Sequence, residues 1–206
     1  MDTSDLLSTL AIVISLGTFF LTWYYQYGKP SQIKLVVGDQ MRLVYAPHDA
    51  HLKFWLNLTF FNEGARGAAV VRVEGSFSRV DSPHRCPLHW VAFIKSQNIA
   101  EPGKLKRWSS FDRFPETIVV PAYSAETRCI AFQCEGVSSI EPGNYAISFV
   151  VVEGPLFRKV AEIGVNLPLT TETTLDLTKA LQDEDGVFEE SLMVTLGRQN
   201  FVLVGQ

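Results

Sequence analysis

The pattern of apolar and polar positions divides the chain at residue 28. From Leu6 to Gly28 no side chain is charged. As a helix rising ~1.5 Å per residue, this run would be roughly 33 Å long, enough to cross a bilayer core of about 30 Å. Aromatic side chains that favour the headgroup boundary close the run, namely Trp23, Tyr24, Tyr25 and Tyr27. The pattern predicts a short tail over residues 1–5 and one transmembrane helix over residues 6–28.

A cleaved signal peptide is the alternative for the same residues. Such peptides have a basic amino-terminal region, a shorter apolar stretch and a small-x-small cleavage site. Here Asp2 and Asp5 make the start acidic, the apolar run is long, and aromatic residues occupy the place of the cleavage site. We therefore expect the segment to be retained as a membrane anchor.

After residue 28 the apolar positions recur with a period of two. The clearest strand covers residues 51–61, where five apolar residues alternate with polar or outward-facing ones: Leu52, Phe54, Leu56, Leu58 and Phe60. Such alternation places one face of a strand in a core, and Trp55 and Phe61 are then expected on the other face. Further strands are expected at 33–37, 41–45, 68–77, 88–94, 117–120, 127–134, 144–152 and 157–166.

Short strands separated by Pro and Gly turns, with no long helix after the anchor, predict an all-β antiparallel sandwich over residues 29–168. Residues 117–152 resemble the second half of an immunoglobulin-like sandwich. Tyr145 opens a strand just after Gly143, which is similar to a tyrosine corner, where the phenol bonds to the backbone. An ordinary core tyrosine is the alternative. The resemblance is architectural, covers residues 33–152 and identifies no family, because the cysteine pair and tryptophan of antibody domains are missing.

Residues 169–206 are expected to form a C-terminal appendage. A short helix over 170–182, capped by Thr170 or Thr171, competes with an extended chain because four threonines lie near its start. Alternation over 188–196 and the apolar residues 201–204 predict a β-hairpin. Since an isolated hairpin is only marginally stable in water, it must pack on the sandwich or on another chain.

Basic residues predict which side of the membrane the domain faces. All 18 Lys and Arg follow the span, and Lys29, Lys34 and Arg42 lie close to its end. Because positive residues resist translocation, the N-terminus is expected outside and the C-terminal domain in the cytoplasm. The alternative is the opposite orientation, with a periplasmic or extracellular domain.

The cysteines favour the same cytoplasmic orientation. There are three, Cys86, Cys129 and Cys134, and an odd number without framework spacing suits a reducing compartment. Cys129 and Cys134 lie five positions apart, so in one continuous strand they would face opposite sides and could not bridge.

Signals for chemistry are weak. The part after the span has a net charge of −2 (20 acidic residues, that is 22 less Asp2 and Asp5, against 18 basic), which argues against a nucleic-acid partner. Residues of metal-ligating type occur as His48/His51 and His84/Cys86/His89 but lack the doubled motifs of structural zinc sites. We expect solvated loop histidines and a buried thiol. Because hydrolase, kinase and metalloprotease motifs are also missing, we expect no enzyme, no cofactor and no metal.

One segment, residues 104–114, combines four basic residues with three aromatic ones. Arg and Trp are enriched at binding hot spots, and the same mixture suits anionic headgroups. We expect partner or headgroup binding from Lys104, Lys106, Arg107, Trp108, Phe111 and Arg113. A loop whose aromatic side chains fold inward is the alternative.

Small and hydroxyl residues form a stripe on the expected anchor: Ser8, Ala11, Ser15, Thr18 and Thr22. They could pack against another helix, or bond to carbonyl groups of their own helix. Together these features predict a membrane-anchored binding module, an accessory or adaptor subunit with a protein partner or a second copy. The alternative is an exported anchored sandwich that binds a ligand or envelope component, and a metal-dependent enzyme is less favoured.

Overall fold

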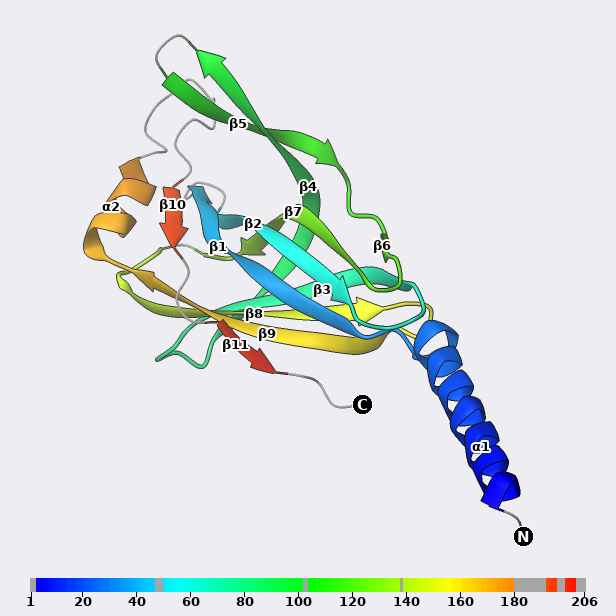
Figure 1. Ribbon diagram of the computed structural model, residues 1–206. Coiled ribbons are helices and arrows are strands. Elements are labelled where there is room, and N and C mark those ends of the chain that lie inside the picture. Colours follow the sequence, from blue (N-terminus) through cyan, green and yellow to red (C-terminus); the bar gives the residue numbers. More distant parts are fainter. Residues whose placement is uncertain are drawn as a thin grey trace.

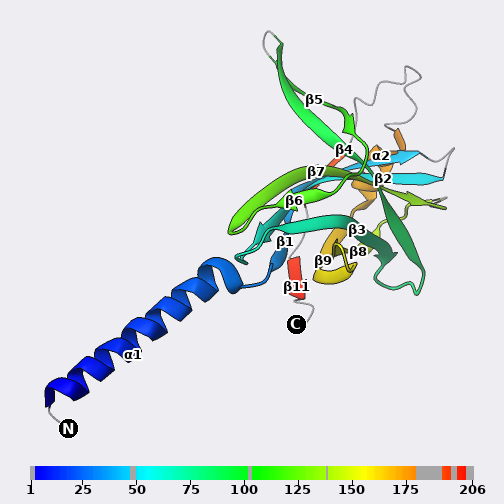
Figure 2. The ribbon, with the colours of Figure 1, turned by 90° about the vertical axis from the view of Figure 1, so that its right-hand side faces the viewer.

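The computed structural model describes residues 3–46, 50–101, 104–137, 139–179, 192–195 and 199–202, although the side chains between residues 96 and 109 and after residue 177 lie outside its description. The chain begins with helix α1 (Thr3–Trp23), which continues as a wider turn, η1 (Tyr24–Gly28). This helix is long and apolar enough to span a membrane, and none of it is buried against the rest of the chain. Figures 1 and 2 show it standing clear of the β domain.

The remaining elements are almost all strands. In chain order they are β1 (Ile33–Ala46), β2 (His51–Asn62), β3 (Ala68–Arg79), β4 (Arg85–Glu101), β5 (Lys104–Arg113), β6 (Ile118–Val120), β7 (Ser124–Glu135), β8 (Gly143–Glu153), β9 (Arg158–Leu169), helix α2 (Thr171–Lys179), β10 (Leu192–Thr195) and β11 (Gln199–Val202). The two segments expected at 33–37 and 41–45 form one strand, β1, with an irregularity in its register between Val37 and Met41.

The strands form one antiparallel sheet in the order β10-β1-β2-β7-β4-β3-β8-β9-β11, with β5 added to β4 and β6 to β3. Because β1 also contacts β9, the sheet is nearly closed and barrel-like. We expected two separate sheets, as in an immunoglobulin-like sandwich. The strand pairing instead forms a single sheet. Gly75 of β3 is opposite both Leu88 of β4 and Phe149 of β8, so β3 joins the strands on its two sides into one sheet. A Cβ atom at Gly75 would lie 2.8 Å from the Leu88 Cβ, so glycine permits this close pairing.

The core follows the alternation expected for β2. The five predicted inward residues are at most 2 % exposed, while Trp55 is half-buried and Phe61 is 40 % exposed on the outer face. Aromatic rings connect strands that are not neighbours in the sheet across the inside of the barrel, including Phe54 of β2 with Phe77 of β3 and Phe132 of β7 with Phe149 of β8. The buried face of β2 is thus the part of the core that the sequence predicted in most detail.

Tyr145 makes the bond expected of a tyrosine corner. Its hydroxyl donates to the Glu141 carbonyl oxygen at 2.9 Å, four residues upstream. The ring is also buried and stacks on Phe77 with 4.9 Å between centroids. Tyr145 therefore makes the backbone bond of a tyrosine corner and is also a core residue, although the sheet is barrel-like.

The C-terminal segment differs from the expected hairpin. Helix α2 begins as predicted, with the Thr173 amide donating to Thr170 Oγ1 at 3.1 Å. However, β10 pairs with β1 and β11 pairs with β9, so neither pairs with the other. Strands β1 and β9 offer unpaired backbone groups at the two ends of the sheet, and adding a strand there is more favourable than a free two-stranded ribbon.

The junction between α1 and the domain is organised by one buried amide. Asn62 is 2 % exposed, and its carbonyl oxygen accepts from the Gln32 and Gly64 amides at 3.1 and 2.9 Å. Its amide nitrogen donates to the Arg66 carbonyl at 2.7 Å. A buried polar group that loses its hydrogen-bond partners destabilises the fold. Asn62 therefore holds the segment that follows the helix against the loop that follows β2.

Candidate functional site

Residues 104–114 do not form the loop that was the alternative from sequence. Residues 104–113 are strand β5, which pairs with β4 from Glu101↔Lys104 to Phe93↔Arg113. Strand β4 pairs with β7 only as far as Phe93. Beyond that point the two strands continue as a ribbon that leaves the barrel, which we call the β4–β5 arm (residues 94–101 and 104–111; Figures 1 and 2).

Of the six residues expected to bind a partner, the structure describes the side chains of two, Phe111 and Arg113. The side chains of Lys104, Lys106, Arg107 and Trp108 lie outside the described part, although their backbone belongs to the arm. All six therefore share one strand, and five of them, all but Arg113, lie where the strand has left the barrel.

The base of the arm exposes aromatic rings. Phe111 and Phe114 are 55 % and 75 % exposed and contact each other edge to face, with 5.1 Å between centroids. At these two positions the alternative of inward-folding aromatics does not hold. Large exposed aromatic side chains are unusual on a protein surface without a partner.

Arg113 carries a charge that is partly balanced. Its guanidinium donates to Asp112 at 3.2 Å and to Glu116 at 2.5 Å. The hydrogen bond to the Asp112 carboxylate and the negative charge of Glu116 raise the pKa of Arg113 above its ordinary value. It also lies 5.8 Å from the centre of the Phe93 ring. These contacts hold Arg113 against the base of the arm.

The predicted stripe lies on α1, and its five residues are exposed in this single chain. Thr18 Oγ1 donates to the Ile14 carbonyl at 2.8 Å, which is the bond within the helix that the alternative hypothesis expects. Ser8, Ala11, Ser15 and Thr22 remain a surface of small side chains. Helix packing by the stripe stays a prediction.

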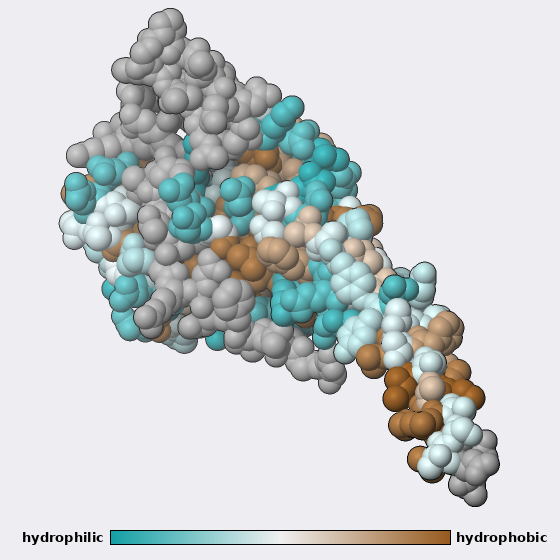
Figure 3. Space-filling model, viewed as in Figure 1, coloured by the Kyte–Doolittle hydropathy of each residue, from teal (hydrophilic) through white to brown (hydrophobic). Residues whose placement is uncertain are grey.

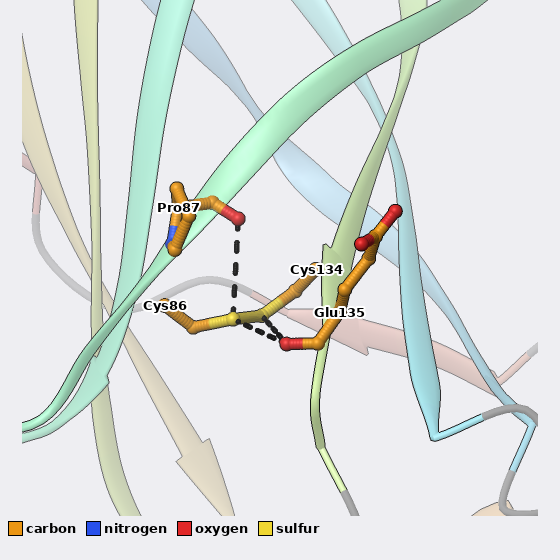
Figure 4. The surroundings of a disulfide bond; sticks show 4 residues. All are labelled: Cys86, Pro87, Cys134 and Glu135. Carbon is orange, nitrogen blue, oxygen red and sulfur yellow. Dashed lines mark hydrogen bonds between the residues drawn. A yellow bond between two sulfur atoms is a disulfide. The ribbon is translucent and has the colours of Figure 1, made fainter.

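The expectation of a thiol at Cys86 was wrong, because Cys86 and Cys134 form a disulfide (Figure 4). Their Cα atoms are 6.1 Å apart, across the neighbouring strands β4 and β7. Cys129 is not part of this disulfide, and it does not pair with Cys134, as expected from their spacing. The sulfur of Cys86 lies 3.1 Å from the Glu135 carbonyl oxygen. This is a contact and not a donated hydrogen bond, since a disulfide sulfur carries no hydrogen.

The disulfide also changes the candidate metal ligands. Cys86 cannot supply a thiolate while it is bonded to Cys134, and His84 and His89 are exposed on either side of it. His51 opens β2 opposite Glu135, while His48 lies outside the described residues. The described members of both clusters thus lie near the C-terminal end of β7.

A depression of about 370 Å³ lies beside the disulfide. It is lined by residues at the end of β3, in the β3–β4 turn, at the start of β4, and at the end of β7 and just after it, among them Arg79, His84, Cys86 and Glu135. Arg79 Nη1 bonds to Glu141 at 2.6 Å, while its Nε is buried and has no hydrogen-bond partner among the described residues. The sequence did not indicate this depression, because the pairing of β3, β4 and β7 assembles it from distant segments.

No family model matches this chain, and no curated protein sequence matches it. Among solved structures, the chain is similar to a family 123 glycoside hydrolase from Clostridium perfringens with 11 % identity and a TM-score of 0.32, over 62 % of this chain and 25 % of that one. It is also similar to the putative ApaA protein from Bordetella pertussis with 12 % identity and a TM-score of 0.33, over 65 % of this chain and 92 % of that one. The chain spans about a quarter of the hydrolase. Similarities of this size give no basis for assigning an activity.

Proposed function

We propose that this protein is a single-pass membrane-anchored binding module, an accessory subunit whose β4–β5 arm contacts a partner protein. The observation that carries the proposal is the uncovered apolar helix. Ten Leu, Ile, Val and Phe side chains between Leu6 and Leu21 are more than half exposed. Removing them from water is worth on the order of 10 kcal/mol or more, at roughly 1.5–3 kcal/mol for each side chain fully buried. Figure 3 shows that the domain leaves this surface free.

The orientation of the domain follows from weighing two opposing signals. Lys29 and Lys34 favour a cytoplasmic domain, but the bias rests on few charges. The Cys86–Cys134 disulfide favours the opposite side, because disulfides persist in oxidising compartments and are reduced in the cytosol. The covalent bond is part of the fold, so we give it more weight. The domain is thus proposed to face the periplasm or the cell exterior, which was the alternative from sequence.

The β4–β5 arm is the proposed contact for three reasons. A two-stranded ribbon is only marginally stable in water, so an arm that leaves the barrel gains from a partner. Its base exposes Phe111 and Phe114. Residues 104–114, which cover the second strand of the arm and its base, include four basic residues and one acidic one, in a chain of net charge −4. An acidic protein surface is the partner that this charge contrast favours.

Site-specific photo-crosslinking in native membranes tests the proposed contact. A crosslinking amino acid is placed in the full-length chain at Phe111 or, as the matched control, at Val80, which are 55 % and 58 % exposed. We expect a discrete protein adduct from position 111 and none from position 80. Adducts to lipid alone, or the same adducts from both positions, would contradict the proposal.

Charge reversal then asks whether the basic residues of the arm select the partner. The variant carries Lys104→Glu, Lys106→Glu and Arg107→Glu, and we expect it to lose the adduct. The control reverses three exposed charges elsewhere, Lys34, Arg72 and Arg128, and should retain it. An adduct that survives in the first variant would show that the arm does not recognise an acidic partner through these charges.

A further inference from the structure

The turn between β8 and β9 exposes two large apolar side chains at its tip. Leu156 is 86 % exposed and Phe157 is 67 % exposed. Two basic residues follow directly, Arg158 and Lys159, whose side chains are each 61 % exposed. A protruding apolar pair beside cations is typical of a segment that meets a membrane interface. We call residues 154–159 the β8–β9 tip.

The β8–β9 tip lies at the end of the domain where the helix enters. Glu153, directly before the tip, accepts from Ser31 Oγ at 2.5 Å and also pairs with Arg158 at 3.1 Å. Ser31 is three residues beyond Gly28, so Ser31, to which Glu153 is hydrogen-bonded, lies within about 10 Å of the end of the apolar run, at ~3.5 Å per extended residue. In Figure 1, α1 leaves the domain on the same side as the end of β8.

Several contacts hold this end of the domain against the helix. The Lys29 carbonyl accepts from the Ala65 amide at 3.0 Å. The Tyr123 hydroxyl donates to the carbonyl of Tyr25, inside η1. With the Asn62 bonds at Gln32, these contacts tie two loops of the barrel to the last turn of the helix and to the residues that follow it. The β8–β9 tip therefore has a fixed place relative to the anchor.

We propose that the β8–β9 tip inserts into the headgroup layer of the same bilayer that holds α1, so that the domain rests on the membrane. This inference depends on the proposed anchoring of α1. The headgroup layer is several ångströms thick on each side of the hydrocarbon core, which is within reach of side chains on a tip so close to Ser31. Leu156 and Phe157 enter the boundary of the acyl chains, and Lys159 and Arg158 lie level with the lipid phosphates.

The opposite end of the barrel supplies a matched control. Strand β3 runs from Ala68 to Arg79, about 35 Å along the strand at ~3.3 Å per residue. The Gly154 amide bonds to the Ala69 carbonyl at 2.9 Å, which places the β8–β9 tip at the beginning of β3. Val80 follows the end of β3 and is 58 % exposed. A membrane that meets Leu156 should not reach Val80.

The test measures quenching of a fluorophore by spin-labelled lipid. The background is full-length Cys129→Ser, which leaves the disulfide intact and provides no other thiol. Single variants Leu156→Cys, Val80→Cys and Leu16→Cys are labelled with the same environment-sensitive dye and reconstituted in phosphatidylcholine vesicles. One set of vesicles contains phosphatidylcholine with a nitroxide on the headgroup, and a second set contains it on the acyl chain.

The three positions separate the two proposals. We expect the headgroup nitroxide to quench most of the fluorescence at position 156 and almost none at position 80, while the acyl-chain nitroxide quenches position 16. Quenching at 16 with positions 156 and 80 equally unquenched would overturn the insertion of the tip and leave the anchor in place. Loss of quenching at 16 would overturn the anchor itself, and with it this inference.

Discussion

Removing the Cys86–Cys134 disulfide should lower the free energy of unfolding of the barrel by several kcal/mol. The bond closes a loop with a sequence separation of 48. In the chain-entropy relation a loop of this length contributes about 4 kcal/mol. At a urea dependence of about 2–3 kcal/mol per molar, the unfolding midpoint should fall by roughly 1.5–2 M.

The assay is urea unfolding of the full-length chain in detergent micelles, with and without a phosphine reductant. The reductant opens the bond without deleting a side chain, so it isolates the cross-link. Cys86→Ala/Cys134→Ala should begin with the lowered midpoint and show no response to the reductant. Cys129→Ala, which removes the cysteine outside the disulfide, should respond as the natural chain does. A midpoint of the natural chain that the reductant does not move would refute the reasoning.

Three further predictions concern single side chains. Tyr145→Phe keeps the ring stacked on Phe77 but loses the bond to the Glu141 carbonyl, and thermal unfolding should show a loss of about 1 kcal/mol. Burial raises the pKa of Tyr45 above 10.0; the unfolded phenol therefore ionises first as the pH rises, and stability is lost as the pH passes through the folded pKa. In Tyr45→Phe, the unfolding midpoint should fall less steeply as the pH is raised through this range. An unchanged slope of midpoint against pH would contradict the raised pKa of Tyr45. A Cβ at Gly64 would lie 2.0 Å from the Pro30 carbonyl oxygen, whereas one at Gly67 would lie 3.7 Å from the nearest atom. Gly64→Ala should therefore cost roughly 1–3 kcal/mol and Gly67→Ala about 0.5 kcal/mol or less, and equal melting temperatures would contradict the packing of the junction.

The local elements could be predicted because their signals are local. The period of two in β2 identified which of its faces is buried, and the Thr170 cap identified the start of α2. The closure of the sheet could not be predicted, since inward and outward residues alternate equally in a sandwich and in a barrel. Strand β3 joins β4 on one side to β8 on the other, and Gly75 is opposite both Leu88 and Phe149. This pairing connects segments that are far apart in the sequence.

The candidate sites show the same division. The composition of residues 104–114 singled out the segment, but only its pairing with β4 shows that it is an arm rather than a loop. The partner of Cys86 was missed because a count of cysteines contains no information on which strands become neighbours. Phe157 was the first residue of an expected strand and Leu156 lay just before it, whereas the position of both at the tip follows from the turn between β8 and β9.

Membrane extraction of the full-length chain tests the central claim most directly. Membranes are washed in alkaline carbonate and then dissolved in detergent, and the intact mass of the protein is measured in each fraction. We expect the protein to stay in the carbonate pellet, to be released by detergent and to retain residues 6–28. Release by carbonate, or a mature protein without those residues, would contradict a lipid-embedded helix that tethers the barrel.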